Sequence, residues 1–231
     1  MQLCITAFFL TETWRMMKNN RILVVATRNK GKKAEIQDLL KDFPIAVKNL
    51  NDFGPIPEAP EDGSTFDENA YQKSSLTARV LGLPALADDS GLCVEALGGA
   101  PGVHSARYAG ENATDAEKGE KLLAEMKGFQ NRNAAFECVL SIAVPTGAAL
   151  TYEARCEGII TEAPIGENGF GYDPVFYYPP LEKTFAQLTM TEKSRVSHRG
   201  KALREFKSEI DRVLVWIEQQ MPVEERFECK E

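Results

Sequence analysis

Hydrophobic and polar positions at the start of the chain follow the order strand, helix, strand. Residues 22–27 form a short run rich in β-branched side chains, which predicts a strand buried on both faces. A helix is predicted next, because apolar residues recur at helical spacing before Pro44, at Ala34, Ile36, Leu39, Leu40 and Phe43. Residues 45–50 predict a second strand, so the chain opens with a βαβ unit.

Two helices in the middle of the chain are indicated by their first residues. Residues 65–68 have the sequence of a capping box, and the helix that they begin extends to about Leu81. Residues 85–87 then predict a short strand that ends at a pair of aspartates. Thr114 begins another helix with a capping box of its own, and Gly128 ends that helix.

The second half of the chain combines a hairpin with a long terminal helix. Residues 134–144 and 150–156 alternate between apolar and polar side chains, which predicts two strands joined by a turn. Residues 166–171 form a glycine-rich loop, and residues 203–217 have the apolar spacing of one helix. The fold class is therefore α/β with a mixed sheet, and neither a repeat nor a linker divides it.

Composition and charge exclude several classes of protein. The chain has 231 residues, 43% of them hydrophobic, and a net charge of −7, which argues against sustained binding to nucleic acid. No apolar run approaches the ~18 residues that span a bilayer. Five widely spaced cysteines without a C-x-x-C pair indicate reduced thiols and a cytoplasmic protein. We expect residues 1–20 to be an extension of unknown role, residues 21–220 the functional domain, and residues 221–231 a solvated acidic tail.

A basic loop follows the first predicted strand and precedes a helix. Its residues are Thr27, Arg28, Asn29, Lys30, Gly31 and Lys32. Free backbone N–H groups and the helix dipole favour an anion at such a place, and a lysine adds charge for a phosphate oxygen. The loop is not a Walker A motif, and by itself it is also compatible with a merely solvated basic turn.

Carboxylates gather around the third predicted strand. Asp88, Asp89 and Ser90 are expected at the end of that strand, where open α/β sheets bind ligands. Hard oxygen ligands at this place suit Mg²⁺, and Glu61 and Glu68 are close enough in sequence to contribute. Glu68 is equally explained as part of its capping box.

Two later segments have a composition that suits a nucleobase and its phosphates. Phe170, Gly171, Tyr172 and Asp173 place aromatic rings and a carboxylate on the glycine-rich loop. Lys193, His198 and Arg199 form a second basic cluster at the start of the final helix. Each feature alone is also typical of ordinary packing or of a surface histidine, so the interpretation depends on their occurrence together.

Six segments together resemble the inosine triphosphate pyrophosphatase family of non-standard purine nucleoside triphosphatases. They are residues 26–32 (ATRNKGK), 63–70 (GSTFDENA), 87–92 (ADDSGL), 97–110 (LGGAPGVHSARYAG), 169–176 (GFGYDPVF) and 192–203 (EKSRVSHRGKAL). The resemblance implies an elongated, two-lobed α/β body around a long mixed sheet with flanking helices, a nucleotide in the cleft, and a homodimer. It also implies hydrolysis of ITP, dITP and XTP to the monophosphate and pyrophosphate.

The resemblance also implies roles for individual residues. Thr27, Asn29 and Lys32 are expected at the phosphates, with Lys32 and Asp89 catalytic, and Ser90 beside the substrate. Glu61 and Asp89 are expected to hold Mg²⁺, with Asp89 as proton acceptor for the attacking water. The base pocket is expected to be formed by residues 170–173, Lys193, His198 and Arg199. Two alternatives remain open: a pyrophosphatase for modified pyrimidine nucleotides, and a non-catalytic nucleotide-binding module.

Overall fold

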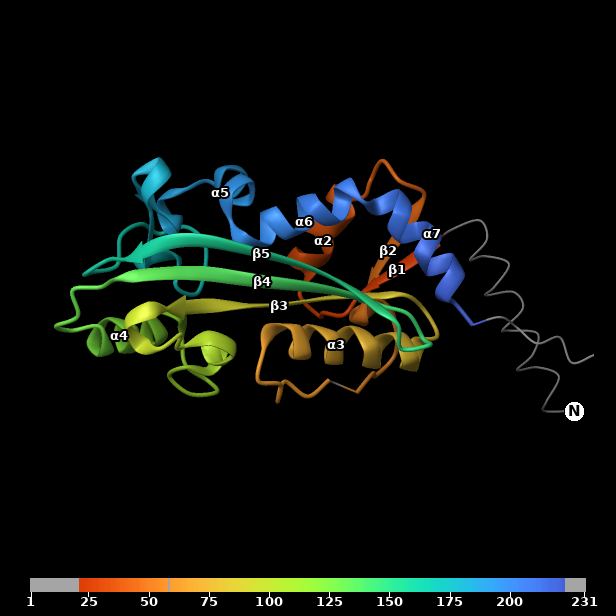
Figure 1. Cartoon of the computed structure of the whole chain (residues 1–231), viewed down its shortest axis with the longest axis horizontal. Helices are drawn as coiled ribbons and strands as arrows, with labels where there is room; N and C mark the ends of the chain where they lie inside the picture. Colours follow the sequence, from red (N-terminus) through yellow and green to blue (C-terminus); the bar gives the residue numbers. More distant parts are fainter. Residues whose placement is uncertain (1–20, 58, 223–231) are drawn as a thin grey trace, which may run out of the picture.

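A mixed seven-stranded sheet runs the length of the molecule (Figure 1). The computed structural model describes residues 21–57 and 59–222, so the expected extension and most of the acidic tail lie outside the described residues. The strands lie in the order β2-β1-β3-β4-β5-β6-β7. Their bounds are Arg21–Val25 (β1), Ile45–Asn49 (β2), Ala85–Val94 (β3), Asn133–Ala143 (β4), Ala149–Ile160 (β5), Phe176–Tyr178 (β6) and Lys183–Thr184 (β7).

Parallel and antiparallel pairing divide the sheet into two parts. β1 pairs in parallel with β2 and with β3, which confirms the βαβ opening. From β3 onward every pairing is antiparallel. β4 and β5 form the expected hairpin and pair without a break from Asn133 to Ala143 of β4. The α/β class and the mixed sheet are therefore confirmed.

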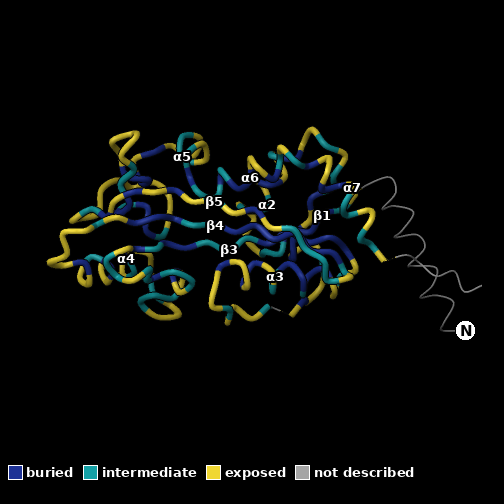
Figure 2. The backbone as a smooth tube through the Cα atoms, in the orientation of Figure 1, coloured by how far each residue is buried: buried dark blue, intermediate teal, exposed yellow. Residues whose placement is uncertain are grey.

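Helices cover both faces of the sheet (Figure 1). α3 (Phe66–Leu81) and α4 (Asp115–Glu125) lie on one face. The other face carries α2 (Lys30–Leu39), α5 (Met190–Val196), α6 (His198–Ser208) and α7 (Ile210–Gln220). β3 and β4 are buried over most of their length and β5 alternates between buried and exposed positions, whereas the loops at both ends of the molecule are largely exposed (Figure 2).

Two hydrophobic cores give the molecule its two lobes. The first lobe packs β1, β2 and α2 against α6 and α7, around residues such as Leu23, Ile36 and Phe206. The second lobe packs β6 and α4 around Phe176 and Phe185. The long strands β3, β4 and β5 contribute to both cores and therefore connect the lobes. This is the elongated two-lobed body that the family resemblance implied.

The third strand is longer than the sequence predicted. β3 continues to Val94, so Asp88, Asp89 and Ser90 lie in the middle of a strand and the expectation of a strand end at this point is wrong. Gly91, which follows these residues, also stays in the strand, in register with Glu137 of β4. A Cβ on Gly91 would lie 2.4 Å from the Gly102 carbonyl oxygen, so the glycine serves close packing of the chain and not a turn.

The terminal helix is divided, which the apolar spacing did not predict. α6 ends at Ser208 and α7 begins at Ile210, with Glu209 between them outside helical geometry. The apolar residues of both helices nevertheless face the same core, because Phe206, Ile210 and Val213 all belong to the first cluster. The break therefore changes the direction of the chain and leaves the buried face continuous.

Candidate active site

A cleft lies where β3 extends beyond its neighbour β1. β1 pairs only with Ala85 and Leu86 of β3, and the chain leaves the sheet after Val25. The cleft opens at the carboxyl end of β1, where α/β sheets commonly bind ligands. Further along the same edge of β3, Leu92 N donates to Ser105 Oγ at 2.9 Å. The cavity has a volume of about 320 Å³. It is lined by Lys32, Glu61, Lys73, Asp88, Asp89, Ser90, Gly91, Ser105, Ala106, Asp115, Lys118, Phe136, Phe170, Gly171, Tyr172, Asp173, Lys193, His198 and Arg199.

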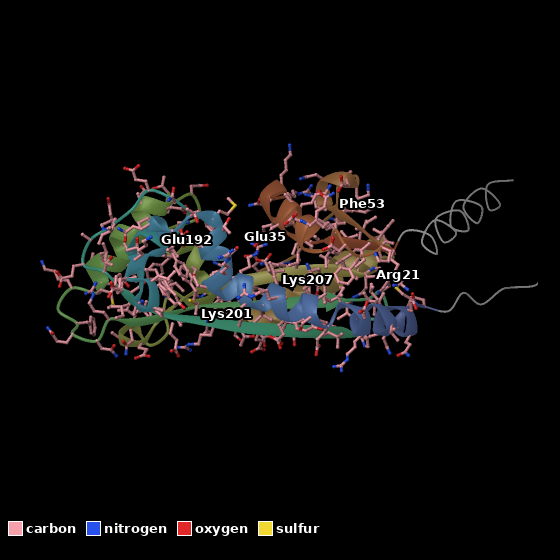
Figure 3. The ribbon with its side chains drawn as sticks, turned by 90° about the horizontal axis from the view of Figure 1, so that it is seen from above. Arg21, Glu35, Phe53, Glu192, Lys201 and Lys207 are labelled. Carbon is pink, nitrogen blue, oxygen red and sulfur yellow. The ribbon has the colours of Figure 1, made fainter. Side chains whose placement is uncertain are left out.

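Asp88 joins the two cations on the α2 and α6 side of the sheet. Lys32 Nζ donates to both of its carboxylate oxygens, at 2.9 and 2.8 Å, and Arg199 Nη1 lies 3.7 Å from Oδ2. Arg199 also pairs with Glu35 of α2, which Figure 3 places at the boundary between the lobes, opposite Glu192 of α5. Burial would raise the pKa of Asp88, but Lys32 and Arg199 outweigh it and lower the pKa well below its ordinary value. Asp88 is therefore a permanently charged anchor for both cations.

Asp89 points to the opposite face, because successive side chains of a strand alternate. Its Oδ1 lies 2.6 Å from Lys73 Nζ of α3, and Asn69 of the same helix donates to Oδ2 at 3.4 Å. Burial raises the pKa of Asp89, Lys73 opposes that shift, and the nearby carboxylate of Glu61 adds to it. Asp89 thus accepts a proton more readily than an ordinary aspartate does.

Lys73 also connects Asp89 to Glu61. Its Nζ lies 2.8 Å from Glu61 Oε1, so one ammonium group is shared by the two carboxylates expected to hold a metal. Arg107 positions the loop behind them, because its Nη2 donates to the Glu61 carbonyl oxygen at 3.0 Å. Hard oxygens that converge on one cation fit Mg²⁺, which commonly takes one or two carboxylates and completes its shell with water and phosphate.

Lys73 and the role of Arg107 were missed by reasoning from the sequence. The signal for Lys73 is its spacing of four residues from Asn69, which puts two polar groups on one helix face. That face packs on the sheet, since Asn69 is 1% exposed. A buried asparagine with a partly buried lysine one helical turn away indicates a ligand or a charged partner.

A second group of residues lies at the far end of the cavity. Lys193 pairs with Asp173, whose Oδ2 also accepts a hydrogen bond from Phe170 N. The Phe170 ring is 71% exposed, with Lys193 Nζ 4.4 Å from its centroid. His198 stacks on Phe136 at 4.8 Å between ring centroids. The structure therefore brings together the expected residues 170–173, Lys193 and His198.

His198 is neutral in this environment. Burial lowers its pKa to about 3, and the charges of Lys193 and Arg199 contribute to the shift. Its Nδ1 is buried and has no hydrogen-bond partner among the residues that the structure describes. A neutral imidazole with an unused nitrogen, at the wall of a cavity, is suited to recognise a polar ligand.

The loop before α2 only partly lines the cavity. Lys32 lies in the lining, whereas Thr27, Arg28, Asn29, Lys30 and Gly31 adjoin it along the chain. Asn29 Oδ1 accepts from Gly31 N and Lys32 N at 2.8 and 3.2 Å, and Thr27 Oγ1 accepts from Asn29 N at 3.1 Å. Both side chains therefore shape the loop and cap α2.

Glu68 has a capping role and lies outside the cavity lining. Its carboxylate accepts from Ser64 N at 2.6 Å, and its own N–H donates to Thr65 Oγ1 at 3.1 Å. Of the two explanations left open by the sequence, the structure supports the cap. Ser90, by contrast, lies in the lining beside Asp89, as expected.

Comparison with known proteins identifies the family of this fold. The model of the Ham1 family matches residues 23–209. The chain belongs to the Ham1 family. This result confirms the resemblance that the six sequence segments indicated.

Relatives within the Ham1 family match nearly their whole length. A Syntrophobacter fumaroxidans protein named dITP/XTP pyrophosphatase is 66% identical over 196 residues, covering 85% of this chain and 84% of that protein. A Desulfotalea psychrophila protein of the same name is 58% identical, with 88% and 91% covered. The structure of a HAM1 protein from Coxiella burnetii superposes with a TM-score of 0.80 at 44% identity, over 83% of this chain and 98% of that one.

Proposed function

We propose that this protein hydrolyses the non-standard purine nucleoside triphosphates dITP, ITP and XTP to the nucleoside monophosphate and pyrophosphate. The observation that carries the proposal is the meeting of Lys32, Asp89 and His198, distant in sequence, in one cavity. Relatives of high identity that are named dITP/XTP pyrophosphatase support the same substrates. We assign the activity to residues 21–220.

The cations of the cavity would bind the triphosphate. Lys32 is held at one side by Asp88, and Lys73 is held at the other by Asp89 and Glu61. Because each cation already has a carboxylate partner, the site is charge-balanced before substrate arrives and needs little rearrangement to receive it. Residues 27–31 lie at the start of α2, where the helix dipole favours an anion.

Asp89 would act as the general base. The oxygen of a water molecule attacks the α-phosphorus, the bond from that phosphorus to the bridging oxygen breaks, and pyrophosphate leaves while Asp89 takes the proton of the water. A raised pKa favours this role, since proton transfer is most efficient when the pKa of the base approaches the working pH. Glu61 and Asp89 would hold Mg²⁺, which when bound offsets the charge that develops on the phosphate oxygens.

The far end of the cavity would receive the base. Phe170 offers an exposed ring face for stacking, and His198 and Arg199 can donate hydrogen bonds to the oxo group at purine C6. Adenine carries an amino group at C6 and would leave such donors unpaired, which disfavours it. Ser90, Gly171, Tyr172, Asp173 and Lys193 complete this part of the site.

A panel of nucleotides with product identification tests the proposal. We expect pyrophosphate and monophosphate from dITP, ITP and XTP in the presence of Mg²⁺, and little product from dATP or without the metal. Preference for modified pyrimidine triphosphates, or bound ITP that stays intact with Mg²⁺ present, would contradict it. We further propose a homodimer, to be checked by light scattering of the purified protein.

None of the helices that the structure describes is long and apolar enough to cross a membrane.

A further inference from the structure

The loop that carries Phe170 is fastened to α4 by a side chain without a role in the proposal above. Gly171 N donates to Asp115 Oδ2 at 2.6 Å, across 56 residues of sequence. Asp115 is the first residue of α4, and its other oxygen lies 2.6 Å from Lys118 Nζ. Both side chains line the same cavity as Asp89 and His198.

The position of the Phe170 ring depends on its backbone. The ring is 71% exposed, so packing contributes little to where it stands. Its backbone is held at two successive residues, since Phe170 N donates to Asp173 at 3.0 Å and Gly171 N donates to Asp115. The side chain of the next residue is held as well, because Tyr172 OH donates to Ser105 O at 2.9 Å. Gly171 has a φ of +62°, a conformation that this loop must maintain for the ring to face the cavity.

The hydrogen bond from Gly171 N to Asp115 differs from the other two hydrogen bonds that hold the loop. Asp173 is also tied to Lys193, which is assigned to the substrate, and Tyr172 is buried in the second core. Asp115 is an exposed residue whose carboxylate accepts a hydrogen bond from Gly171 N and forms an ion pair with Lys118. The Lys118 side chain is 12% exposed, so it is itself confined and keeps the carboxylate directed at Gly171.

We propose that Asp115 is a positioning residue for the nucleobase: through Gly171 it holds the Phe170 ring at the base end of the cavity, and Lys118 orients its carboxylate. The inference rests on the proposed function and adds a determinant of base binding that lies on α4. A hydrogen bond to a carboxylate is among the stronger neutral-to-charged contacts, so its loss should loosen the loop measurably.

The test compares Asp115→Ala with Asp115→Asn and with Glu120→Ala. Asparagine retains an oxygen that can accept from Gly171 N, while both Asp115 variants lose the same charge from the first turn of α4. Glu120 is exposed on the same helix and controls for removal of a carboxylate from it. Hydrogen exchange of the peptide that contains Gly171 should become faster in Asp115→Ala only.

Inhibition constants of two products separate base binding from phosphate binding. In Asp115→Ala we expect inosine monophosphate to inhibit about tenfold more weakly, whereas inhibition by inorganic pyrophosphate stays unchanged. Asp115→Asn and Glu120→Ala should resemble the wild type in both. The KM for dITP should rise in Asp115→Ala with little change in kcat.

The outcomes distinguish this inference from the proposed function. A wild type that releases no pyrophosphate from any triphosphate overturns both. An active wild type with unaltered inosine monophosphate inhibition in Asp115→Ala overturns the role of Asp115 alone. Equal weakening by both products, or an Asp115→Asn variant as impaired as Asp115→Ala, also overturns it, because the effect would then come from charge or general disorder.

Discussion

Asp88 and Asp89 are adjacent on β3, yet their surroundings give them opposite properties. Asp88 lies on the α2 and α6 side, where Lys32 and Arg199 lower its pKa despite burial. Asp89 lies on the α3 side, where burial raises its pKa although Lys73 is within 2.6 Å. The difference teaches that neighbouring aspartates of one motif can differ in acidity: Asp88 loses its proton more readily than an ordinary aspartate, and Asp89 less readily.

The alternation of a strand explains how this division arises. Because neighbouring side chains point to opposite faces, a pair of aspartates on an open strand edge reaches two different sets of partners. Asp88 meets two cations and Asp89 meets one that it shares with Glu61. Burial raises the pKa of both carboxylates; the two cations at Asp88 outweigh it, whereas the shared cation at Asp89 does not.

Substitution of Asp89 tests the base assignment and should have the largest effect. We expect Asp89→Asn to lower kcat by about 10² to 10⁴, because a positioned proton acceptor is removed. Pyrophosphate release from dITP measures the rate. The free energy of unfolding should stay equal or rise, since the raised pKa means that the Asp89 charge costs stability in the folded state. Near-normal turnover would refute the assignment of Asp89.

Substitution of Asp88, unlike that of Asp89, should lower the free energy of unfolding. Asp88→Asn leaves Lys32 and Arg199 without their shared countercharge, so we expect the free energy of unfolding to fall by about 2 kcal/mol. Urea denaturation at neutral pH measures it. The lowered pKa of Asp88 contributes stability that is present above its ordinary value of 3.8 and is lost as the pH falls through the folded value. If Asp88→Asn and Asp89→Asn lower the free energy of unfolding equally, the proposed difference between the two carboxylates is wrong.

Local sequence patterns predicted much of the fold, but only part of the difference between the surroundings of Asp88 and Asp89. The βαβ opening, the hairpin and the caps depend on neighbours in sequence, and the structure confirms them. The length of β3 was missed because Gly91 looks like a stop, whereas it is required by the Gly102 carbonyl packed against it. Lys73 and Asp115 were missed because their partners lie 16 and 56 residues away, where no periodicity reports a contact.

Substitution of Lys73 tests what controls the pKa of Asp89, and its effect should be smaller than that of the two aspartate substitutions. Lys73 lowers the pKa of Asp89, so Lys73→Met should raise that pKa further above its ordinary value. Activity that requires ionised Asp89 should then be lost at a higher pH on acidification. The acid limb of kcat/KM for dITP measures this shift. Lys118→Met serves as a control: it removes a lysine that pairs with Asp115 and not with Asp89, so the pH of the acid limb should stay unchanged. An acid limb that stays in place would show that another group controls it.

Arg107 offers the smallest predicted change, and it concerns only the Asp89 side. Its Nη2 donates to the Glu61 carbonyl oxygen at 3.0 Å, while its Nη1 is 4.0 Å from the Glu61 carboxylate. Arg107→Gln weakens the hold on the acidic loop and leaves both carboxylates in the chain. We therefore expect the Mg²⁺ concentration for half-maximal activity to rise by about threefold to tenfold, since partners that orient a metal ligand tune its affinity.

The control for Arg107→Gln is the free energy of unfolding, the quantity that Asp88→Asn is expected to lower. Arg107 contacts neither Lys32 nor Arg199, so the free energy of unfolding should change far less than in Asp88→Asn. Saturating Mg²⁺ should restore most of kcat, because the arginine acts through Glu61 and touches no reacting atom. A loss of kcat that Mg²⁺ does not recover would instead place Arg107 against the substrate, and the Asp89 side would then contain a second cation for the triphosphate.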